Sequence, residues 1–233
     1  MNRLVVDDPA AAAAERIAAA VGQGGHIVLA GGSTPQQAYE RVAAMNLDWS
    51  RCTVWFGDER CVPPEHELSN YGMARAALLG RLADAAPTVH RMQGELGPRD
   101  GADAYEQLLR EQWGEGMPRT DLMLLGLGPD AHCASLFPGD AALDEQQRWA
   151  VGVQQSGLEP WVSRITLTLP AINAAREVLF IVGGSDKAEA VARAFGGQPR
   201  RDAPASLVSP VDGTLTVLLD EDAAALLPSE ARP

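Results

Sequence analysis

Residues 26–44 read HIVLAGGSTPQQAYERVAA. The apolar run Ile27–Ala30 is followed by two glycines, two hydroxyl residues and a proline, and then by apolar residues at helical spacing. Pro35 suits the first turn of a helix, because its missing N–H has no partner to lose there and its fixed φ is already helical. The stretch therefore predicts a β-strand, a glycine-rich turn and an α-helix over Pro35–Ala44.

The same alternation continues outward in both directions from this stretch. Short apolar or β-branched runs are separated by Ala-rich segments with helical spacing, which is typical of an α/β fold with a mainly parallel sheet. No internal repeat and no low-complexity linker interrupts the pattern. We therefore expect residues 1–233 to form a single Rossmann-like domain, an α/β fold whose mainly parallel β-sheet is flanked by helices on both faces. The predicted strands are Leu4–Val6, Ile27–Ala30, Cys52–Phe56, Leu122–Leu125, Ile165–Leu169, Val178–Val182 and Leu215–Leu219, and the predicted helices are Ala10–Val21, Pro35–Ala44, Tyr71–Leu79, Ala102–Gln112 and Asp186–Phe195.

Composition limits the partners of the chain more than its substrate. With 46% hydrophobic residues, the chain can bury a substantial core. It carries 31 acidic and 19 basic residues, a formal charge of -12, which repels nucleic acid and anionic membrane surfaces. An anionic small molecule is compatible with this charge, because a few cationic side chains in a cleft dominate the local field.

Cysteine usage and the N-terminus predict an intracellular protein. Cys52, Cys61 and Cys133 show no CxxC spacing, so neither a disulfide framework nor a zinc site is indicated. Residues Met1–Pro9 lack the basic and apolar regions of a signal peptide, and no apolar run approaches the roughly 20 residues needed to span a bilayer. We expect a cytoplasmic monomer that binds neither nucleic acid nor membrane.

Ligand sites in open parallel sheets lie beyond the carboxyl ends of the strands. The first such segment contains Gly31, Gly32, Ser33 and Thr34. Glycines let the backbone approach a ligand closely, and the helix start offers free N–H groups beside two hydroxyls that can donate to an anion. This pattern predicts a phosphate cradle without a Walker lysine. The alternative is that Ser33 or Thr34 is only a helix N-cap.

Two further segments supply cationic side chains. Asp58-Glu59-Arg60 follows an apolar strand, and this combination of carboxylates and a guanidinium suits recognition of a phosphate and sugar hydroxyls, with Arg60 binding the anion. Lys187 lies at a predicted helix start, where a cation is unfavourable unless an anion joins it. The alternatives are a solvated charged turn for the first segment and an exposed lysine for the second.

The segment Gly126–His132 follows the most apolar predicted strand. It matches GxGxxA, but Pro129 stiffens the turn, no long helix follows, and no acidic residue ends a second strand about 20 residues later, so a nicotinamide-dependent oxidoreductase is disfavoured. A neutral histidine with a carboxylate nearby is a suitable general base, and His132 beside Asp130 offers this pair. The alternative is a hydrogen-bonded packing histidine.

Covalent catalysis is not indicated by the residues around His132. Cys133 is its neighbour in sequence, and adjacent side chains diverge, whereas a Cys–His pair normally comes from distant segments. Ser135 lacks the GxSxG elbow of serine esterases.

Taken together, five segments resemble the 6-phosphogluconolactonase family, which is related to the glucosamine-6-phosphate isomerases/deaminases. The resemblance extends from about residue 4 to about residue 219. It departs from the family turn PDGHTASLFP at Ala131, which replaces glycine, and at Cys133, which replaces threonine. The matching segments are GGSTP at 31–35, DERCVP at 58–63 with SN at 69–70, GLGPDAHCASLFPG at 126–139, RITLTLPAINAA at 164–175 and GSDKA at 184–188.

This resemblance implies hydrolysis of 6-phospho-D-glucono-1,5-lactone to 6-phospho-D-gluconate, a small sugar-phosphate lactone being the substrate. His132 would be the general base that activates water, and Asp58 would orient His132 or a substrate hydroxyl. Arg60 and Lys187 would hold the phosphate, assisted by the glycine-rich turn. No metal and no cofactor is implied. Asn70 and Arg164 match family positions near the site, either contacting substrate or bracing the loops.

Two alternatives to a lactonase are considered. A glucosamine-6-phosphate isomerase/deaminase would carry segments resembling DEY and GHIAFNEP, where this chain has DER at 58–60 and HCASLFP at 132–138. A non-catalytic sugar-phosphate sensor would keep the phosphate-binding residues without turnover. The altered turn at Ala131 favours the sensor, and the presence of His132 argues against it.

Overall fold

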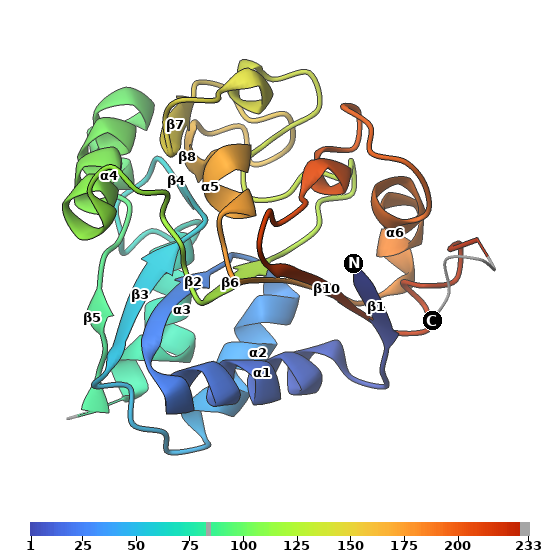
Figure 1. Ribbon diagram of the computed structural model, residues 1–233, viewed down its shortest axis with the longest axis horizontal. Coiled ribbons are helices and arrows are strands. Elements are labelled where there is room, and N and C mark those ends of the chain that lie inside the picture. Colours follow the sequence, from blue (N-terminus) through green and yellow to red (C-terminus); the bar gives the residue numbers. More distant parts are fainter. Residues whose placement is uncertain (83–84, 229–233) are drawn as a thin grey trace.

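A seven-stranded parallel sheet forms the centre of the computed structural model, which describes residues 1–82 and 85–228 (Figure 1). The strand order is β1-β10-β9-β6-β2-β3-β5. Every neighbouring pair of these strands is parallel, which confirms the expected α/β architecture. The strands are β1 (Asn2–Val5), β2 (Gly25–Leu29), β3 (Cys52–Phe56), β5 (Thr88–Val89), β6 (Leu122–Leu125), β9 (Glu177–Val182) and β10 (Thr214–Leu219).

Helices lie on both faces of this sheet. Figure 1 shows α1 and α2 on one face, and α4 and α5 on the other together with a second, smaller sheet. Local signals fix their ends: Asp8 caps α1 by accepting a hydrogen bond from the Ala11 N–H at 3.0 Å, and Pro9 is its first residue. The helices are α1 (Pro9–Gln23), α2 (Ser33–Ala43), α3 (Asn70–Ala77), α4 (Pro98–Trp113), α5 (Leu169–Asn173) and α6 (Ala188–Phe195). Among the described residues, none of the helices combines the length and apolar character that a membrane span requires.

The second sheet is antiparallel and was not predicted. It consists of β4 (Asp58–Arg60), β8 (Arg164–Leu167) and β7 (Ala150–Val153), in the order β4-β8-β7. The expectation that Asp58–Arg60 is a loop is therefore wrong, and so is the placement of Ile165–Leu169 in the parallel sheet. Gly57 is the physical reason for the first error, because its N–H still bonds Leu29 of the large sheet while its carbonyl accepts from Leu167 of the small one.

β8 also ends earlier than the sequence pattern indicated. Thr168 is the N-cap of α5, and Pro170 occupies the first turn of that helix, so the chain cannot remain extended through Leu169. The short helix α5 and the strands β5 and β7 were not predicted. Each is short, and none carries a periodic pattern long enough to be recognised.

The strand order changes direction between β2 and β6. From β2 the chain proceeds to β3 on one side, whereas β6, β9 and β10 extend the sheet on the other side. Loops that leave β2 and β6 at their carboxyl ends therefore diverge and leave a crevice, which is where ligands bind in sheets of this kind. The segments that follow these two strands are the glycine-rich turn after Leu29 and the turn that carries His132.

Candidate active site

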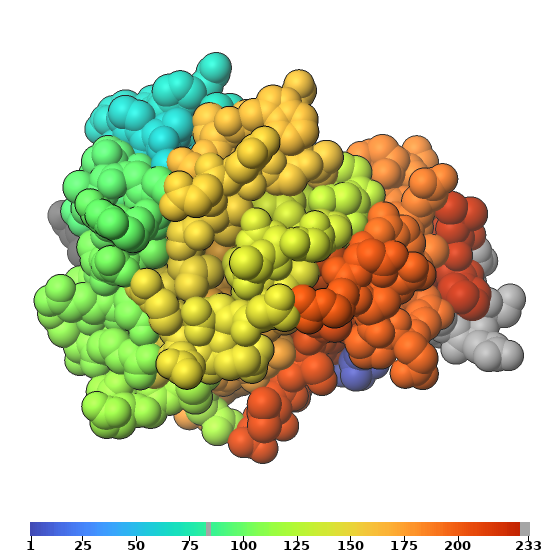
Figure 2. Space-filling view, turned by 90° about the horizontal axis from the view of Figure 1, so that it is seen from above, coloured from blue at the N-terminus to red at the C-terminus, as the bar shows by residue number. Residues whose placement is uncertain are grey.

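A pocket of about 460 Å³ lies at this crevice, a volume suited to a small organic ligand. In the view from above (Figure 2), the yellow-green segment near residues 130–140 lies beside the amber segment near residues 155–165, and both segments contribute to the pocket wall. Every site residue expected from the sequence lines this one pocket: Gly31, Gly32, Ser33, Thr34, Asp58, Arg60, Asn70, His132, Arg164 and Lys187.

The glycine-rich turn is held in place by Tyr39 of α2, which bonds the residue directly before Gly31. The Tyr39 hydroxyl donates to the Ala30 carbonyl at 2.8 Å and accepts from the Ala30 N–H at 2.9 Å, and this pair is buried. At Gly31 a β-carbon would lie 2.0 Å from the Asn70 Oδ1 atom, so only glycine allows the close approach of this turn to α3. Gly32 has φ 110°, which also favours glycine.

Ser33 and Thr34 are not used to cap α2. The N-cap position is Gly32, and Ser33 is already the first helical residue, so the alternative that one of these residues is an N-cap is wrong. Neither hydroxyl has a hydrogen-bond partner within residues 1–82 and 85–228. The hydroxyls and the first N–H groups of α2 are thus available to an anion in the pocket.

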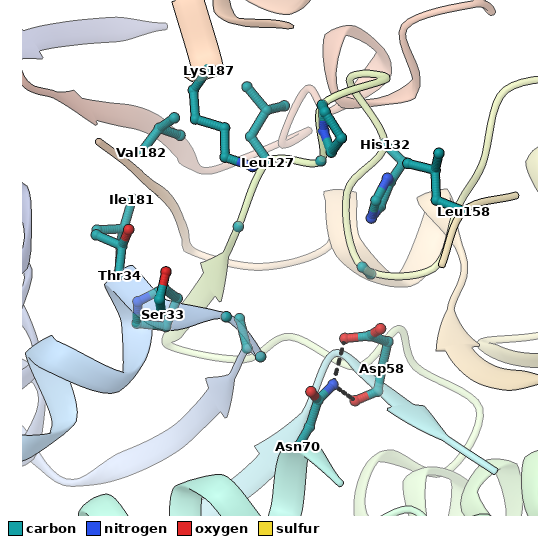
Figure 3. Close-up of a pocket in the computed structure, with 18 of the residues that line it drawn as sticks. Ser33, Thr34, Asp58, Asn70, Leu127, His132, Leu158, Ile181, Val182 and Lys187 are labelled. Atoms are coloured by element: carbon teal, nitrogen blue, oxygen red, sulfur yellow. Dashed lines mark hydrogen bonds between the residues drawn. The ribbon is translucent and has the colours of Figure 1, made fainter. Parts of the chain in front are cut away.

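Lys187 supplies a cation near this helix start. It ends a short 3-10 turn at Ser185–Lys187, directly before α6, and its Nζ is 3.9 Å from the Asp186 carboxylate. Figure 3 shows its side chain extending past Val182 toward Leu127, on the same side of the pocket as Thr34. The lysine side chain is 26% exposed, so it is partly withdrawn from water rather than fully solvated.

The His132 turn closes the crevice on the side of β6. The Gly128 N–H donates to the His132 carbonyl and the Ala131 N–H donates to the Gly128 carbonyl, both at 2.9 Å. A β-carbon at Gly128 would lie 2.0 Å from His132 Nδ1, so this glycine makes room for the imidazole. Ala131 has φ 66°, in the left-handed region that favours glycine. The structure thus gives the alanine the positive φ that glycine would adopt at lower cost.

Asp130 is the hydrogen-bond partner of His132. The Nδ1 to Oδ1 distance is 2.5 Å, and the carboxylate also accepts from the His132 N–H at 3.1 Å. Burial raises the pKa of Asp130, but the bonds from His132 outweigh it, so the net effect is to lower the pKa of this carboxyl. An ionised Asp130 favours the tautomer with the proton on Nδ1, which leaves the Nε2 lone pair free to accept a proton.

Asp58 has partners other than His132. Its Oδ2 accepts from the Ser135 hydroxyl at 2.6 Å, and its Oδ1 accepts from the Asn70 amide at 3.1 Å, as Figure 3 shows for Asn70. Of the two roles expected for Asp58, orientation of the imidazole is therefore wrong, because Asp130 occupies that position. The carboxylate still lines the pocket, where it can meet a substrate hydroxyl.

Glu59 has a structural role at this end of the pocket. The carboxylate is 2% exposed and accepts from the N–H groups of Asn70 and Tyr71 and from the Ser69 hydroxyl, at 2.7, 2.8 and 2.9 Å. Burial raises the pKa of Glu59, and these bonds counteract the rise. Glu59 thereby ties β4 to the start of α3 and fixes Asn70 in the pocket wall.

Arg60 and Arg164 lie directly opposite each other on β4 and β8. Arg164 is 4% exposed and donates to the carbonyls of Val162 and Pro160 at 3.2 and 3.1 Å. Its pKa is lowered by burial and by the neighbouring Arg60. Arg60 donates from Nη1 to the Leu68 carbonyl at 2.6 Å, while its buried Nε has no partner among the described residues. Two cations at the pocket wall attract an anionic ligand.

Pocket residues outside the five matching segments come from the segment 156–159 and from the carboxyl ends of β2 and β9. Leu158 and Glu159 line the pocket from this segment, and Phe137 packs its ring 4.6 Å from that of His132. No sequence pattern marked Leu158 or Glu159, because they belong to an irregular segment.

Cys133 is fully buried, and burial raises the pKa of its thiol, so the rejection of this residue as a nucleophile is consistent with its position. Within the described part of the chain, no three His, Cys, Asp or Glu side chains gather in a way that could hold a metal ion.

Comparison with known proteins places this chain in a family. Residues 2–217 match the family described as glucosamine-6-phosphate isomerases/6-phosphogluconolactonase. The chain belongs to this family.

Relatives in the family point to its 6-phosphogluconolactonase branch. A 6-phosphogluconolactonase from Mycobacterium leprae is 43% identical over 211 residues, which cover 87% of this chain and 85% of that protein. The structure of 6-phosphogluconolactonase from Trypanosoma cruzi superimposes with a TM-score of 0.84 at 28% identity, covering 97% of this chain and 96% of the other. The resemblance predicted from the motifs is thereby confirmed, as is the expectation of an enzyme of this type.

A member of the deaminase branch shares the fold alone. The structure of a monomeric glucosamine-6-phosphate deaminase has a TM-score of 0.82 but only 21% identity, over 97% of this chain and 100% of the other. The fold is thus common to both branches of the family.

Proposed function

We propose that the chain hydrolyses 6-phospho-D-glucono-1,5-lactone to 6-phospho-D-gluconate. The observation that carries this proposal is the Asp130–His132 pair in the turn that lines the pocket, which lies in the segment resembling the lactonase turn PDGHTASLFP. Nε2 of His132 would take a proton from water as the water oxygen attacks the lactone carbonyl carbon. The bond from that carbon to the ring oxygen then breaks, and the ring oxygen takes a proton to become the free hydroxyl.

The phosphate of the substrate is proposed to lie at the start of α2. Ser33, Thr34 and the N–H groups following Gly32 would donate to its oxygens, and Lys187 would neutralise part of its charge. We assign Arg60 to the same anion, approaching it from the second sheet. The hydroxyls of Ser33 and Thr34 support this assignment, because they line the pocket and have no partner among the described residues, so they are available to donate to the phosphate.

Asp58 and Asn70 are proposed to contact the sugar hydroxyls. The Asp58 carboxylate is held by Ser135 and Asn70, so its remaining acceptor positions have a fixed direction toward the pocket. Arg164 is proposed to brace the segment 156–162, because its Nε and Nη2 already donate to the backbone carbonyls of Val162 and Pro160.

The test is the opening of freshly generated phosphorylated lactone by the purified chain, measured above spontaneous hydrolysis. Unphosphorylated glucono-1,5-lactone is the matched control substrate. We expect clear acceleration with the phosphorylated lactone and a much higher KM without the phosphate. Binding of 6-phosphogluconate without any acceleration would contradict the enzyme and support the sugar-phosphate sensor instead.

A further inference from the structure

We propose that Ser135 is a positioning residue that fixes the His132 turn relative to the Asp58 carboxylate; this inference rests on the function proposed above. Ser135 is fully buried, with 0% of its surface exposed, and it does not line the pocket. Its role is therefore one of placing other groups rather than of touching the substrate.

The first support is the pair of bonds that Ser135 makes to the second sheet. Its hydroxyl donates to Asp58 Oδ2 at 2.6 Å, and its N–H donates to Thr166 Oγ1 at 3.1 Å. Asp58 and Thr166 are direct partners across β4 and β8. One residue of the turn thus bonds both members of a cross-strand pair, which fixes its position in two directions.

The second support is the backbone of the turn itself. Ala131 and Ala134 both have positive φ, at 66° and 48°, and neither is glycine. L-residues pay a free-energy cost in this region, so local preference does not hold the turn in its observed shape. Contacts from outside the turn must do so, and Ser135 provides two of them next to Ala134.

The third support is the distribution of partners on the Asp58 carboxylate. Asn70 binds Oδ1 and Ser135 binds Oδ2, so the two bonds together prevent rotation of the carboxylate. Removing the Ser135 hydroxyl would free one oxygen of a buried carboxylate and release the turn from β4 in the same step. The imidazole of His132 and the carboxylate of Asp58, which our proposal places at the attacking water and at the sugar hydroxyls, would then move relative to each other.

The test is the kinetics of Ser135→Ala on the phosphorylated lactone. We expect kcat to fall about 10- to 100-fold, since a displacement of about 1 Å can cost a factor of about 100. KM and 6-phosphogluconate affinity should stay within about threefold, because the phosphate contacts are untouched. Thr216→Val is the control: it also removes a buried hydroxyl, one on β10 without a partner in the described residues, and should change neither parameter.

A double-mutant cycle with Asp58→Ala separates positioning from general destabilisation. Either substitution breaks the same bond, so the loss in the double variant should be clearly smaller than the product of the single losses. If Ser135→Ala fails to fold, Thr166→Val probes the same link from the opposite strand and should show the same fall in kcat with little change in KM.

Two outcomes overturn the inference. A folded Ser135→Ala with wild-type kcat would exclude a positioning role. So would a double variant whose loss in kcat equals the product of the losses in Ser135→Ala and Asp58→Ala. Failure of the proposed function is seen separately, because wild type itself would then not accelerate lactone opening.

Discussion

At the scale of one residue, Ala131 occupies a backbone position whose conformation favours glycine. It has φ 66° where the family motif has glycine. We predict that Ala131→Gly raises the free energy of unfolding by about 1 kcal/mol, because glycine adopts this region without the steric cost that alanine pays. Urea denaturation measures the change.

Ala19, an exposed residue within α1, is the matched control for this substitution. Glycine there should lower the free energy of unfolding by about 1 kcal/mol, since it adds backbone entropy to the unfolded state without relieving strain. Destabilisation by the same change at both positions would contradict the assignment of strain to Ala131.

Gly128 tests the position of the imidazole. An added β-carbon would lie 2.0 Å from His132 Nδ1, so Gly128→Ala must displace the ring. We predict a fall in kcat of about 100-fold, as expected for a misplaced catalytic group. Steady-state kinetics of Gly128→Ala and Gly126→Ala are compared. Gly126→Ala is the control, because the β-carbon added there would meet only the Gly31 carbonyl, at 3.5 Å. Equal losses in both variants would argue against a specific displacement of His132.

Single residues also show which contacts of the site could be predicted from the sequence. Asp130 and His132 are two positions apart, so their pairing could be anticipated from the turn. The bond from Ser135 to Asp58 joins residues 77 positions apart and depends on a second sheet that the pattern did not reveal. Its only sequence signal was that Ser135 belongs to the same motif as His132.

At the scale of elements, β2, β3, the residue after β5 and the end of α4 together form a cluster of aromatic and histidine side chains. His26 Nδ1 accepts a hydrogen bond from the Trp55 Nε1–H at 3.1 Å, and the His90 ring stacks on Trp55 at 4.3 Å. Trp113 of α4 lies 4.8 Å from the His26 ring. Burial lowers the pKa of both histidines. Asp121 raises the pKa of His26 and Glu111 that of His90, while His90 lowers that of His26.

These shifts predict that stability falls in mild acid. The unfolded chain takes up protons on these histidines at higher pH than the native chain does, so the contribution is complete above the unfolded pKa of about 6.5 and declines as pH falls through it. Urea midpoints at pH 7.5 and 5.5 measure the effect. The double variant His26→Gln, His90→Gln should show a weaker pH dependence of stability than wild type, and an unchanged pH dependence would contradict the assignment to these two histidines.

Elements were predictable where a periodic pattern was long and local. Six of the seven strands of the parallel sheet, all but β5, and the five longer helices follow from apolar runs and helical spacing. β4 could not be found in this way, because Asp58-Glu59-Arg60 is charged throughout and becomes a strand only by pairing with Arg164–Thr166. The expectation of a loop at Asp58–Arg60 was wrong because long-range strand pairing outweighed local composition.

At the scale of the whole molecule, the pocket is lined by segments of both the parallel and the antiparallel sheet. Lys187 and the glycine-rich turn belong to the parallel sheet, whereas Arg60 and Arg164 belong to the antiparallel one. This arrangement is compatible with an acidic chain of net charge -12, because Arg60, Arg164 and Lys187 all line the one pocket that would take an anion. The oligomeric state of the chain stays a prediction.

The two cations assigned to the phosphate can be separated by substrate comparison. We predict that Lys187→Gln and Arg60→Gln each raise KM for the phosphorylated lactone about 10- to 100-fold, the usual size of a lost bond to a charged group. KM for unphosphorylated glucono-1,5-lactone should change little. If Arg60→Gln impairs both substrates equally, Arg60 serves the lactone end of the pocket rather than the phosphate.

The most direct test of the account is the rate of 6-phosphogluconolactone opening by wild type and His132→Ala, run in parallel with spontaneous hydrolysis and no metal added. We predict that wild type accelerates opening. The variant, shown to be folded and still binding 6-phosphogluconate, should lose about 100-fold or more of that acceleration, as removal of a general base requires. A folded His132→Ala that opens the lactone at the wild-type rate would contradict the central claim.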